Sequence, residues 1–215
     1  MSGWTRHTGV AVALDRENVD TDQLIPARFM STPRSQGYGG FLFHDLRNDA
    51  DGNPVPDFPL NAVPEASVLV ARRNFGSGSS REAAVYALVD FGIRVVIAPS
   101  FGDIFAGNAI NNGLLPARVS QTGIEAVIAD LGSAPEEVSV DLVERTIWIG
   151  GRQLGFTLDD VWQQKLINGW DDIDLTSQHK KAVAAFRAQY VQQMPWAMPV
   201  QQTDFRSAGR KTGSP

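Results

Sequence analysis

The 215-residue sequence contains no cysteine. Without thiols the chain can form no disulfide bond and can supply no thiolate ligand to an iron–sulfur cluster, so any such cluster must belong to a partner. The three histidines, His7, His44 and His179, are far apart in the sequence and none of them shows metal-ligand spacing. We therefore predict that this chain itself binds no metal.

An excess of positive charge and a long apolar run are also missing. The chain has 19 Lys and Arg against 24 Asp and Glu, a net charge of −5, whereas nucleic-acid binding favours a basic patch. No run approaches the roughly 18 apolar residues of a membrane span, and the N-terminal residues lack an apolar core. We expect a cytoplasmic protein that binds neither nucleic acid nor membrane.

What is present is the composition of an ordinary globular protein, with 43% hydrophobic and 20% charged residues. The length is enough for one sizeable hydrophobic core. We expect a single domain over residues 1–200. The polar residues that follow, 201–215, predict a disordered C-terminal tail.

The chemistry-bearing stretch is residues 73–84, RNFGSGSSREAA. An apolar run before it, Ser67–Ala71, predicts a buried strand, and the apolar segment Glu82–Phe91 predicts a buried helix. Gly76 and Gly78 have no Cβ, so the backbone between strand and helix can turn sharply and approach a ligand. The stretch therefore has the composition of a ligand-binding loop.

The serines of this loop precede the predicted helix. Either Ser79 or Ser80 is expected to be its N-cap, and the free N–H groups of the first turn would then favour an anion. Arg81 adds a forked donor that matches a carboxylate or phosphate. The stretch lacks the third glycine of a dinucleotide fingerprint and the full pattern of a P-loop or nucleophile elbow. An ordinary glycine-rich turn is the alternative interpretation.

Further elements follow from the same patterns. A strand at Arg94–Ala98 would complete a right-handed parallel crossover, which places the glycine loop at the carboxyl end of the first strand. Ser100 is expected to cap the next helix, and Gly150-Gly151 indicates a hairpin. The other predicted strands are Gly9–Leu14, Leu114–Val119, Val138–Leu142, Thr146–Ile149 and Arg152–Phe156. The other predicted helices are Phe101–Asn111, Thr122–Leu131, Asp159–Ile167 and Ser177–Gln192.

Two more segments carry candidate functional residues. Asp20 and Asp22 flank Thr21, and such a cluster either caps a turn or lies beside a site. Residues 29–61 show little periodicity and are predicted to be mostly loop, of a length typical of lids. Arg34 and Tyr38 are the lid residues best able to recognise a substrate, together with Phe41 and Phe43. Packing of the two phenylalanines against a partner is an equal alternative.

Residues 74–82, NFGSGSSRE, resemble the signature of the swivelling domain of the aconitase superfamily, most closely that of the small-subunit family of 3-isopropylmalate dehydratase. Similar blocks occur in the same order at residues 18–26, 95–105 and 111–116. Ser77 and Ala83 depart from the pattern, which usually has cysteine and histidine there. The resemblance implies an α/β fold: a β/β/α swivelling domain whose mixed or parallel sheet is flanked by helices.

The resemblance also implies an activity, the isomerisation of 2-isopropylmalate and 3-isopropylmalate by dehydration and rehydration in leucine biosynthesis. Ser79 corresponds to a base that works as an alkoxide, and Arg81 to a clamp for a substrate carboxylate. A large subunit is implied as the partner in a heterodimer, with a [4Fe–4S] cluster whose open iron takes the leaving hydroxyl. The isolated chain is expected to be inactive. Substrate contacts are expected at Ser77, Gly78, Ser80, Asp20, Thr21, Arg34 and Tyr38.

Two alternatives stay open at this point. The departures at Ser77 and Ala83 would also fit the small subunit of a related hydro-lyase that acts on citraconate, methylmalate or homoaconitate. One methylene changes discrimination by only about 1–3 kcal/mol, so composition does not identify the acid. A binding module that has lost catalysis is the second alternative, although the chain retains Ser79, Ser80 and Arg81.

Overall fold

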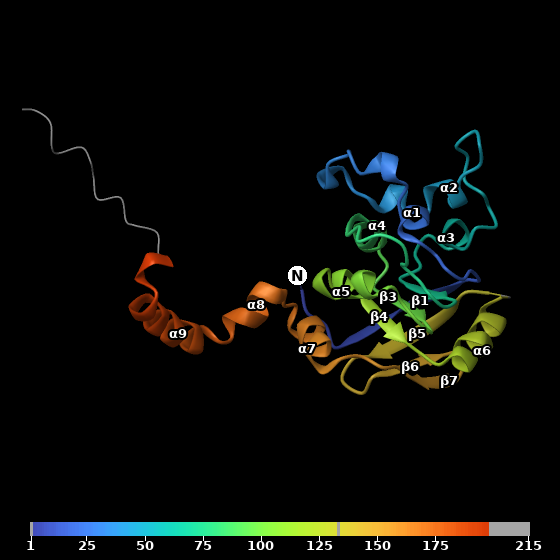
Figure 1. Ribbon diagram of the computed structural model, residues 1–215. Helices are drawn as coiled ribbons and strands as arrows, with labels where there is room; N and C mark the ends of the chain where they lie inside the picture. The colour runs from blue at the N-terminus through green and yellow to red at the C-terminus, as the bar shows by residue number, and fades with distance from the viewer. Residues whose placement is uncertain (1, 133, 198–215) are drawn as a thin grey trace, which may run out of the picture. The chain divides into compact units, whose positions relative to one another are not determined.

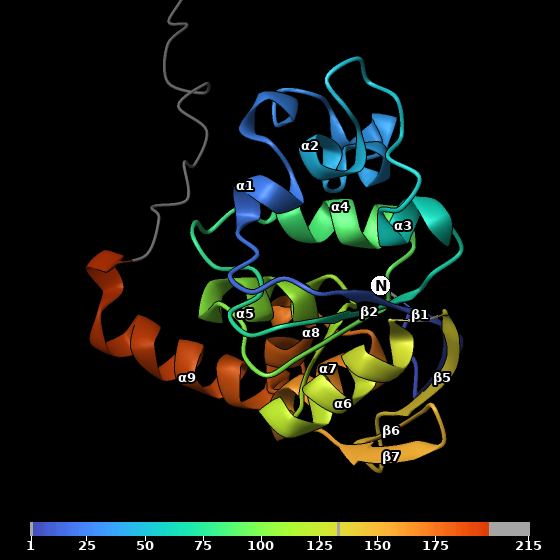
Figure 2. The ribbon, with the colours of Figure 1, turned by 90° about the vertical axis from the view of Figure 1, so that its right-hand side faces the viewer.

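A seven-stranded mixed sheet forms the centre of the larger of two compact units (Figures 1 and 2). The computed structural model describes residues 2–132 and 134–197. The strand order is β4-β3-β2-β1-β5-β6-β7. Strands β1 to β4 run parallel, and β5, β6 and β7 join antiparallel. Their bounds are β1 Arg6–Leu14, β2 Val68–Ala71, β3 Val95–Ala98, β4 Leu115–Arg118, β5 Glu136–Asp141, β6 Thr146–Ile149 and β7 Arg152–Gly155.

The parallel strands are buried on both faces, as their continuous apolar sequences predict. All four residues of β2 and of β3 are buried. Along each strand, alternate side chains enter two different cores. Leu69 and Val96 belong to a core that includes residues of α4 (Ala83–Phe91), whereas Val68 and Val95 belong to one that includes residues of α6 (Gln121–Leu131). Figure 2 shows α4 and α6 on opposite faces of the sheet. The predicted α/β fold is confirmed.

The antiparallel strands form a meander that completes the second core. β6 and β7 are joined by Gly150 and Gly151, whose φ angles of 55° and 70° lie in the left-handed region. Consecutive positive φ angles match the twist of a two-residue hairpin. The hairpin predicted from the two glycines is confirmed, and Trp148 stays partly exposed on its outer face.

The helices match the predicted positions within a few residues. In α4 and α6, and in α5 (Asp103–Asn111) and α7 (Asp160–Asn168), apolar side chains of each helix are buried. The segment predicted as mostly loop contains several single helical turns. These turns are α1 Thr21–Leu24, η1 Ala27–Phe29, η2 Arg34–Gln36, η3 Gly39–Phe41, α2 His44–Arg47 and α3 Pro59–Ala62.

Two predicted helix caps are wrong. Helix α4 begins at Ala83, its N-cap is Glu82, and its first turn has no side-chain cap hydrogen bond, so neither Ser79 nor Ser80 caps it. Helix α5 has Gly102 rather than Ser100 as its N-cap. In both places the serine hydroxyl has another partner, which tertiary contacts determine and which the local sequence does not reveal.

The second compact unit begins at Leu175, after α8 (Asp172–Ser177) has started. It contains α9 (Lys180–Gln193), which buries none of its described side chains, and a short turn η4 (Pro195–Ala197). Phe186 and Tyr190, both in α9, stack their rings on each other with the ring centroids 5.6 Å apart. The single-domain prediction over residues 1–200 stays a prediction, and the tail predicted at 201–215 lies outside the described residues.

None of the helices within residues 2–132 and 134–197 combines the length and apolar character that crossing a membrane requires.

Candidate active site

Three loops meet at the carboxyl ends of the parallel strands. The loop after β2, residues 72–82, contains the serines and is called the serine loop below. It pairs with the loop after β1 through a bridge between Asp20 and Ser77, and with the loop after β3 through a bridge between Phe75 and Phe101. Ligands of open α/β sheets bind at this edge, as the predicted crossover requires. The sequence therefore placed the serine loop correctly.

Two asparagines hold the start of the serine loop. Asn18 and Asn74 have φ angles of 54° and 62°, a left-handed conformation that asparagine tolerates better than most residues. The Asn74 side-chain amide donates to the Asn18 side-chain oxygen at 2.8 Å, and the Asn74 backbone N–H donates to Ser100 Oγ at 2.9 Å. Ser100 thus fixes the serine loop instead of capping α5.

Glycine is required at the centre of this junction. Gly76 has φ 71°, and a Cβ there would lie 2.2 Å from the ring of Phe105. A Cβ at Gly102 would lie 2.5 Å from the Gly76 carbonyl oxygen. The Gly76 N–H donates to the Val19 carbonyl at 2.7 Å. The serine loop is therefore packed against its neighbours at backbone distance, which fixes its path up to the serines.

The contact between Ser79 and Thr21 is the chemical centre of the arrangement. The two hydroxyl oxygens are 2.9 Å apart, and the Ser79 backbone N–H donates to Thr21 Oγ1 at 3.3 Å. Thr21 is only 1% exposed, while Ser79 is half-buried. Two segments predicted separately as site segments thus meet at hydrogen-bonding distance.

The charged residues of the two segments are also paired. Arg81 Nη1 donates to Asp22 Oδ1, and Arg81 is about a quarter exposed. Asp20 instead caps α1: its Oδ1 accepts from the Gln23 N–H at 2.8 Å, and the Gln23 side chain accepts from the Asp20 N–H. The turn-capping interpretation therefore holds for Asp20. The sequence signalled Asp22 by position but did not identify it as the partner of Arg81.

The other serine-loop candidates lie around this centre. Ser77 is half-buried, and its carbonyl accepts from the Thr21 N–H at 3.0 Å. Gly78 and Ser80 are exposed, so both are open to a ligand. Ala83, the residue that departs from the usual histidine, is 9% exposed and belongs to the core beside α4.

Arg34 and Tyr38 contact the second half of α4 rather than the serines. The Arg34 guanidinium lies 3.7 Å above the Tyr86 ring and pairs with Asp90 at 3.2 Å. Tyr38 is 6% exposed, its N–H donates to Asp90 at 3.0 Å, and its hydroxyl donates to the Thr32 carbonyl at 2.7 Å. These contacts anchor the segment to α4. Burial raises the pKa of Tyr86, which favours the neutral phenol beneath the guanidinium.

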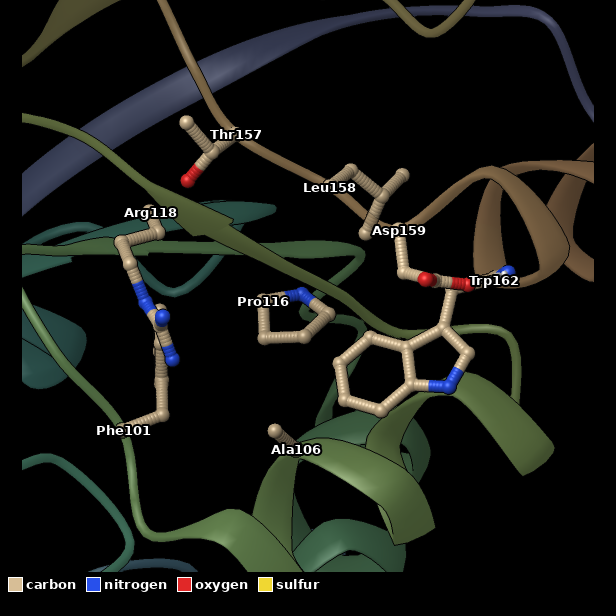
Figure 3. Close-up of a pocket in the computed structure, with 8 residues that line it drawn as sticks. All are labelled: Phe101, Ala106, Pro116, Arg118, Thr157, Leu158, Asp159 and Trp162. Carbon is tan, nitrogen blue, oxygen red and sulfur yellow. Dashed lines mark hydrogen bonds between the residues drawn. The ribbon is translucent and has the colours of Figure 1, made fainter.

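A pocket that the sequence analysis missed lies at the same sheet edge. It has a volume of about 420 Å³ and lies between α5, the end of β4 and the start of α7 (Figure 3). In Figure 3, Arg118 and Thr157 lie on one side of Pro116, and Asp159 and Trp162 lie on the other. The pocket joins residues more than 50 positions apart, so no local sequence pattern indicated it.

Within residues 2–132 and 134–197, no cluster of three or more His, Asp or Glu side chains is arranged to hold a metal ion. The site therefore offers hydroxyls, a guanidinium and backbone amides. Such groups can bind a carboxylate and exchange a proton, but they supply no Lewis acid.

The fold and the site together correspond to a known class of domain. The family model described as the aconitase C-terminal domain matches residues 1–122, and the chain belongs to this family. The matched region holds β1 to β4 and the serine loop.

Individual relatives are more specific than the family model. The chain is 48% identical to the 3-isopropylmalate dehydratase small subunit of Shouchella clausii, over 84% of this chain and 92% of the relative. It is 47% identical to the one from Shewanella denitrificans, over 87% and 96%. A crystal structure of 3-isopropylmalate dehydratase from Methanocaldococcus jannaschii matches with a TM-score of 0.61 and 27% identity, over 84% of this chain and 98% of that chain. The resemblance to the small-subunit family is confirmed.

Proposed function

We propose that the chain is the small subunit of a 3-isopropylmalate dehydratase, a hydro-lyase that interconverts 2-isopropylmalate and 3-isopropylmalate. The observation that carries the proposal is the contact between Ser79 and Thr21 beside Arg81, at the edge where the parallel strands end. Removing water from such a hydroxy acid requires a base, an anion clamp and a Lewis acid. This chain has groups for the first two tasks.

Ser79 is the proposed base, and Thr21 makes that role chemically reasonable. The Thr21 hydroxyl has one proton to donate, and its oxygen accepts a hydrogen bond from the Ser79 N–H. Because Thr21 is buried from water, the proton is left unsatisfied unless it points at Ser79 Oγ, 2.9 Å away. A hydrogen bond donated by the Thr21 hydroxyl to Ser79 Oγ stabilises the Ser79 alkoxide more than the neutral serine, since hydrogen bonds to charged acceptors are stronger. The effect is that of an oxyanion donor aimed at the base.

Arg81 is the proposed clamp for a substrate carboxylate. Asp22 accepts from Nη1 and leaves the other guanidinium donors available for a second carboxylate. Because Asp22 is largely exposed, it can hold Arg81 in place without burying the pair. Ser77, Gly78 and Ser80 are proposed to contact the same ligand from the serine loop.

The Lewis acid is proposed to come from a large subunit, and the active site then lies between the two subunits. The cysteine thiolates that hold a [4Fe–4S] cluster cannot come from a chain without cysteine, so the cluster would be held by the partner. Bound there, it would supply the Lewis acid for the departing hydroxyl. This chain contributes proton transfer and carboxylate binding from its own side of the interface. The cytoplasm, where thiols stay reduced, is the proposed location.

The experiment is anaerobic assembly with the matching large subunit, followed by hydration and dehydration assays on isopropylmalate, citraconate and homoaconitate. We expect turnover with isopropylmalate to have the highest kcat/KM. A preference for another acid would assign the chain to a related hydro-lyase and would point to Ser77 and the Arg34 and Tyr38 segment. No turnover with any acid, despite complex formation and a loaded cluster, would overturn the enzyme assignment.

A further inference from the structure

The pocket at the end of β4 has an apolar floor and a polar rim. Its buried floor is formed by five residues from separate parts of the chain: Phe101, Ala106, Pro116, Leu158 and part of Trp162. Its rim consists of the exposed residues Arg118, Thr157 and Asp159. An apolar centre surrounded by exposed polar groups is the anatomy of an interface hot spot, whereas small-molecule sites enclose most of the ligand.

The two charges on the rim differ in their bonding. Asp159 is the N-cap of α7, and its Oδ1 accepts from the Val161 N–H at 2.8 Å and from the Trp162 N–H at 3.3 Å. In the described part of the chain, the Arg118 guanidinium takes part in no ion pair and no hydrogen bond. The pocket therefore presents one uncommitted positive charge beside an apolar hollow. A carboxylate is the group that a guanidinium fork binds best.

The pocket is continuous with the serine loop. Phe101 lines the pocket, and its backbone bridges Phe75 of the serine loop. The rings of Phe75 and Phe101 also make an edge contact at 6.3 Å. A partner surface that covers the serine loop would therefore reach the pocket as well.

We propose that this pocket is a docking point for the large subunit, which inserts a large apolar side chain into the floor and pairs a neighbouring carboxylate with Arg118. The inference rests on the proposed function, because it assumes that a large subunit closes the site. It adds a specific anchor to that interface. The anchor lies beside the catalytic groups but touches no reacting atom.

Arg94 offers a matched control for Arg118. It is also exposed and also lines a pocket with a tryptophan, Trp4. Arg94 precedes β3, whereas Arg118 is the last residue of β4. Because these strands are parallel, the two arginines lie at opposite ends of the strands. Replacing each arginine by glutamate therefore makes the same charge reversal at the two opposite ends of the strands, and the effects on assembly can be compared.

The test measures the dissociation constant between the full chain and the cluster-loaded large subunit, for wild type, Arg118→Glu and Arg94→Glu. We expect Arg118→Glu to weaken assembly about 30-fold or more, the range of interface hot spots, and Arg94→Glu to change it less than about threefold. Both variants should unfold at the wild-type temperature, because within residues 2–132 and 134–197 neither guanidinium has an ion pair to lose.

The remaining outcomes separate this inference from the proposed function. With saturating large subunit, Arg118→Glu should regain the wild-type kcat and KM. Equal weakening by both variants would mean a general charge effect, and unchanged assembly would remove the anchor; either result overturns the inference. Normal assembly with a raised KM would assign the pocket to a small ligand instead. If the wild-type pair assembles without any turnover, the proposed function fails while the docking result still stands.

Discussion

The parallel and antiparallel halves of the sheet differ in the burial of their strands and in their loops: every residue of β2 and β3 is buried, whereas β7 has no buried residue. After β1, β2 and β3, parallel connections leave loops that converge at one edge and bring Thr21 to Ser79. The antiparallel strands β6 and β7 are joined by a two-residue turn, which has no room for a site. The family model also matches residues 1–122, where the parallel strands lie. The antiparallel half thus helps to complete one core, whereas the parallel half carries the loops of the proposed site.

Removing the Ser79 hydroxyl should give the largest effect. Ser79→Ala is expected to lower kcat of the assembled enzyme by about 10²- to 10⁴-fold, the usual contribution of a positioned general base. Ser139→Ala, the same change on β5 in the antiparallel half, should leave kcat within about twofold. Steady-state assays with saturating partner measure both. Comparable losses of kcat in the two variants would contradict the assignment of the catalytic groups to the parallel half.

A methyl group at Gly76 should be the most destabilising small change. Gly76→Ala combines an unfavourable left-handed conformation, about 1–2 kcal/mol, with a clash against the Phe105 ring that costs about 1–3 kcal/mol more. Gly151 in the antiparallel hairpin has nearly the same φ, 70°, but open space around it. Gly151→Ala should cost only the conformational part. Urea unfolding of the free chain gives both values, and equal losses would show that the serine loop is loosely packed.

The Thr21 hydroxyl should affect the rate through Ser79. Thr21→Val keeps the shape but removes the donor, and is expected to lower kcat about 10- to 100-fold, as expected for a hydrogen bond to a charged group. Without the donor the Ser79 alkoxide is less stable, so the rise of activity with increasing pH should shift to higher pH. Thr21→Ser should restore most of the rate. A loss of stability without a shifted pH profile would reduce Thr21 to a packing residue.

The smallest effect is expected at Asp141 on β5. Its carboxylate accepts from the Glu144 and Val143 N–H groups and pairs with Arg6 at 2.7 Å, and the Glu144 bond is the main cause that lowers its pKa. A lowered carboxyl pKa stabilises the fold at neutral pH, and this contribution is lost as pH falls through the folded-state pKa.

Asp141→Asn should therefore cost about 1 kcal/mol at pH 7, since hydrogen bonds to a charged group are replaced by neutral ones. The difference from wild type should shrink at pH 3 in urea unfolding curves, and kcat of the assembled enzyme should be unchanged. A lower kcat for this variant would mean that the antiparallel half does more than support the core.

The sequence predicted the parts of the fold that depend on local pattern. The all-buried strands Val68–Ala71 and Val95–Ala98 and the Gly150-Gly151 hairpin followed from apolar runs and turn chemistry. The caps failed because serines compete for several partners: Ser100 bonds to the Asn74 N–H and Ser79 to Thr21. Such choices depend on which loops meet, which a local pattern does not contain.

The candidate site was predictable to the same extent. The resemblance selected Ser79, Arg81 and Thr21, and the structure brings all three into one cluster with Asp22. Arg34 and Tyr38 are anchored on α4, and their predicted substrate contacts stay predictions. The Arg118 pocket could not be predicted, because its walls come from three separated segments that only the folded sheet brings together.

The most direct test follows isopropylmalate dehydration with the chain alone, the cluster-loaded large subunit alone, and both together, under anaerobic conditions. The account predicts turnover only in the mixture, because the base and the Lewis acid lie on different chains. Turnover by either chain alone at the rate of the mixture would contradict it.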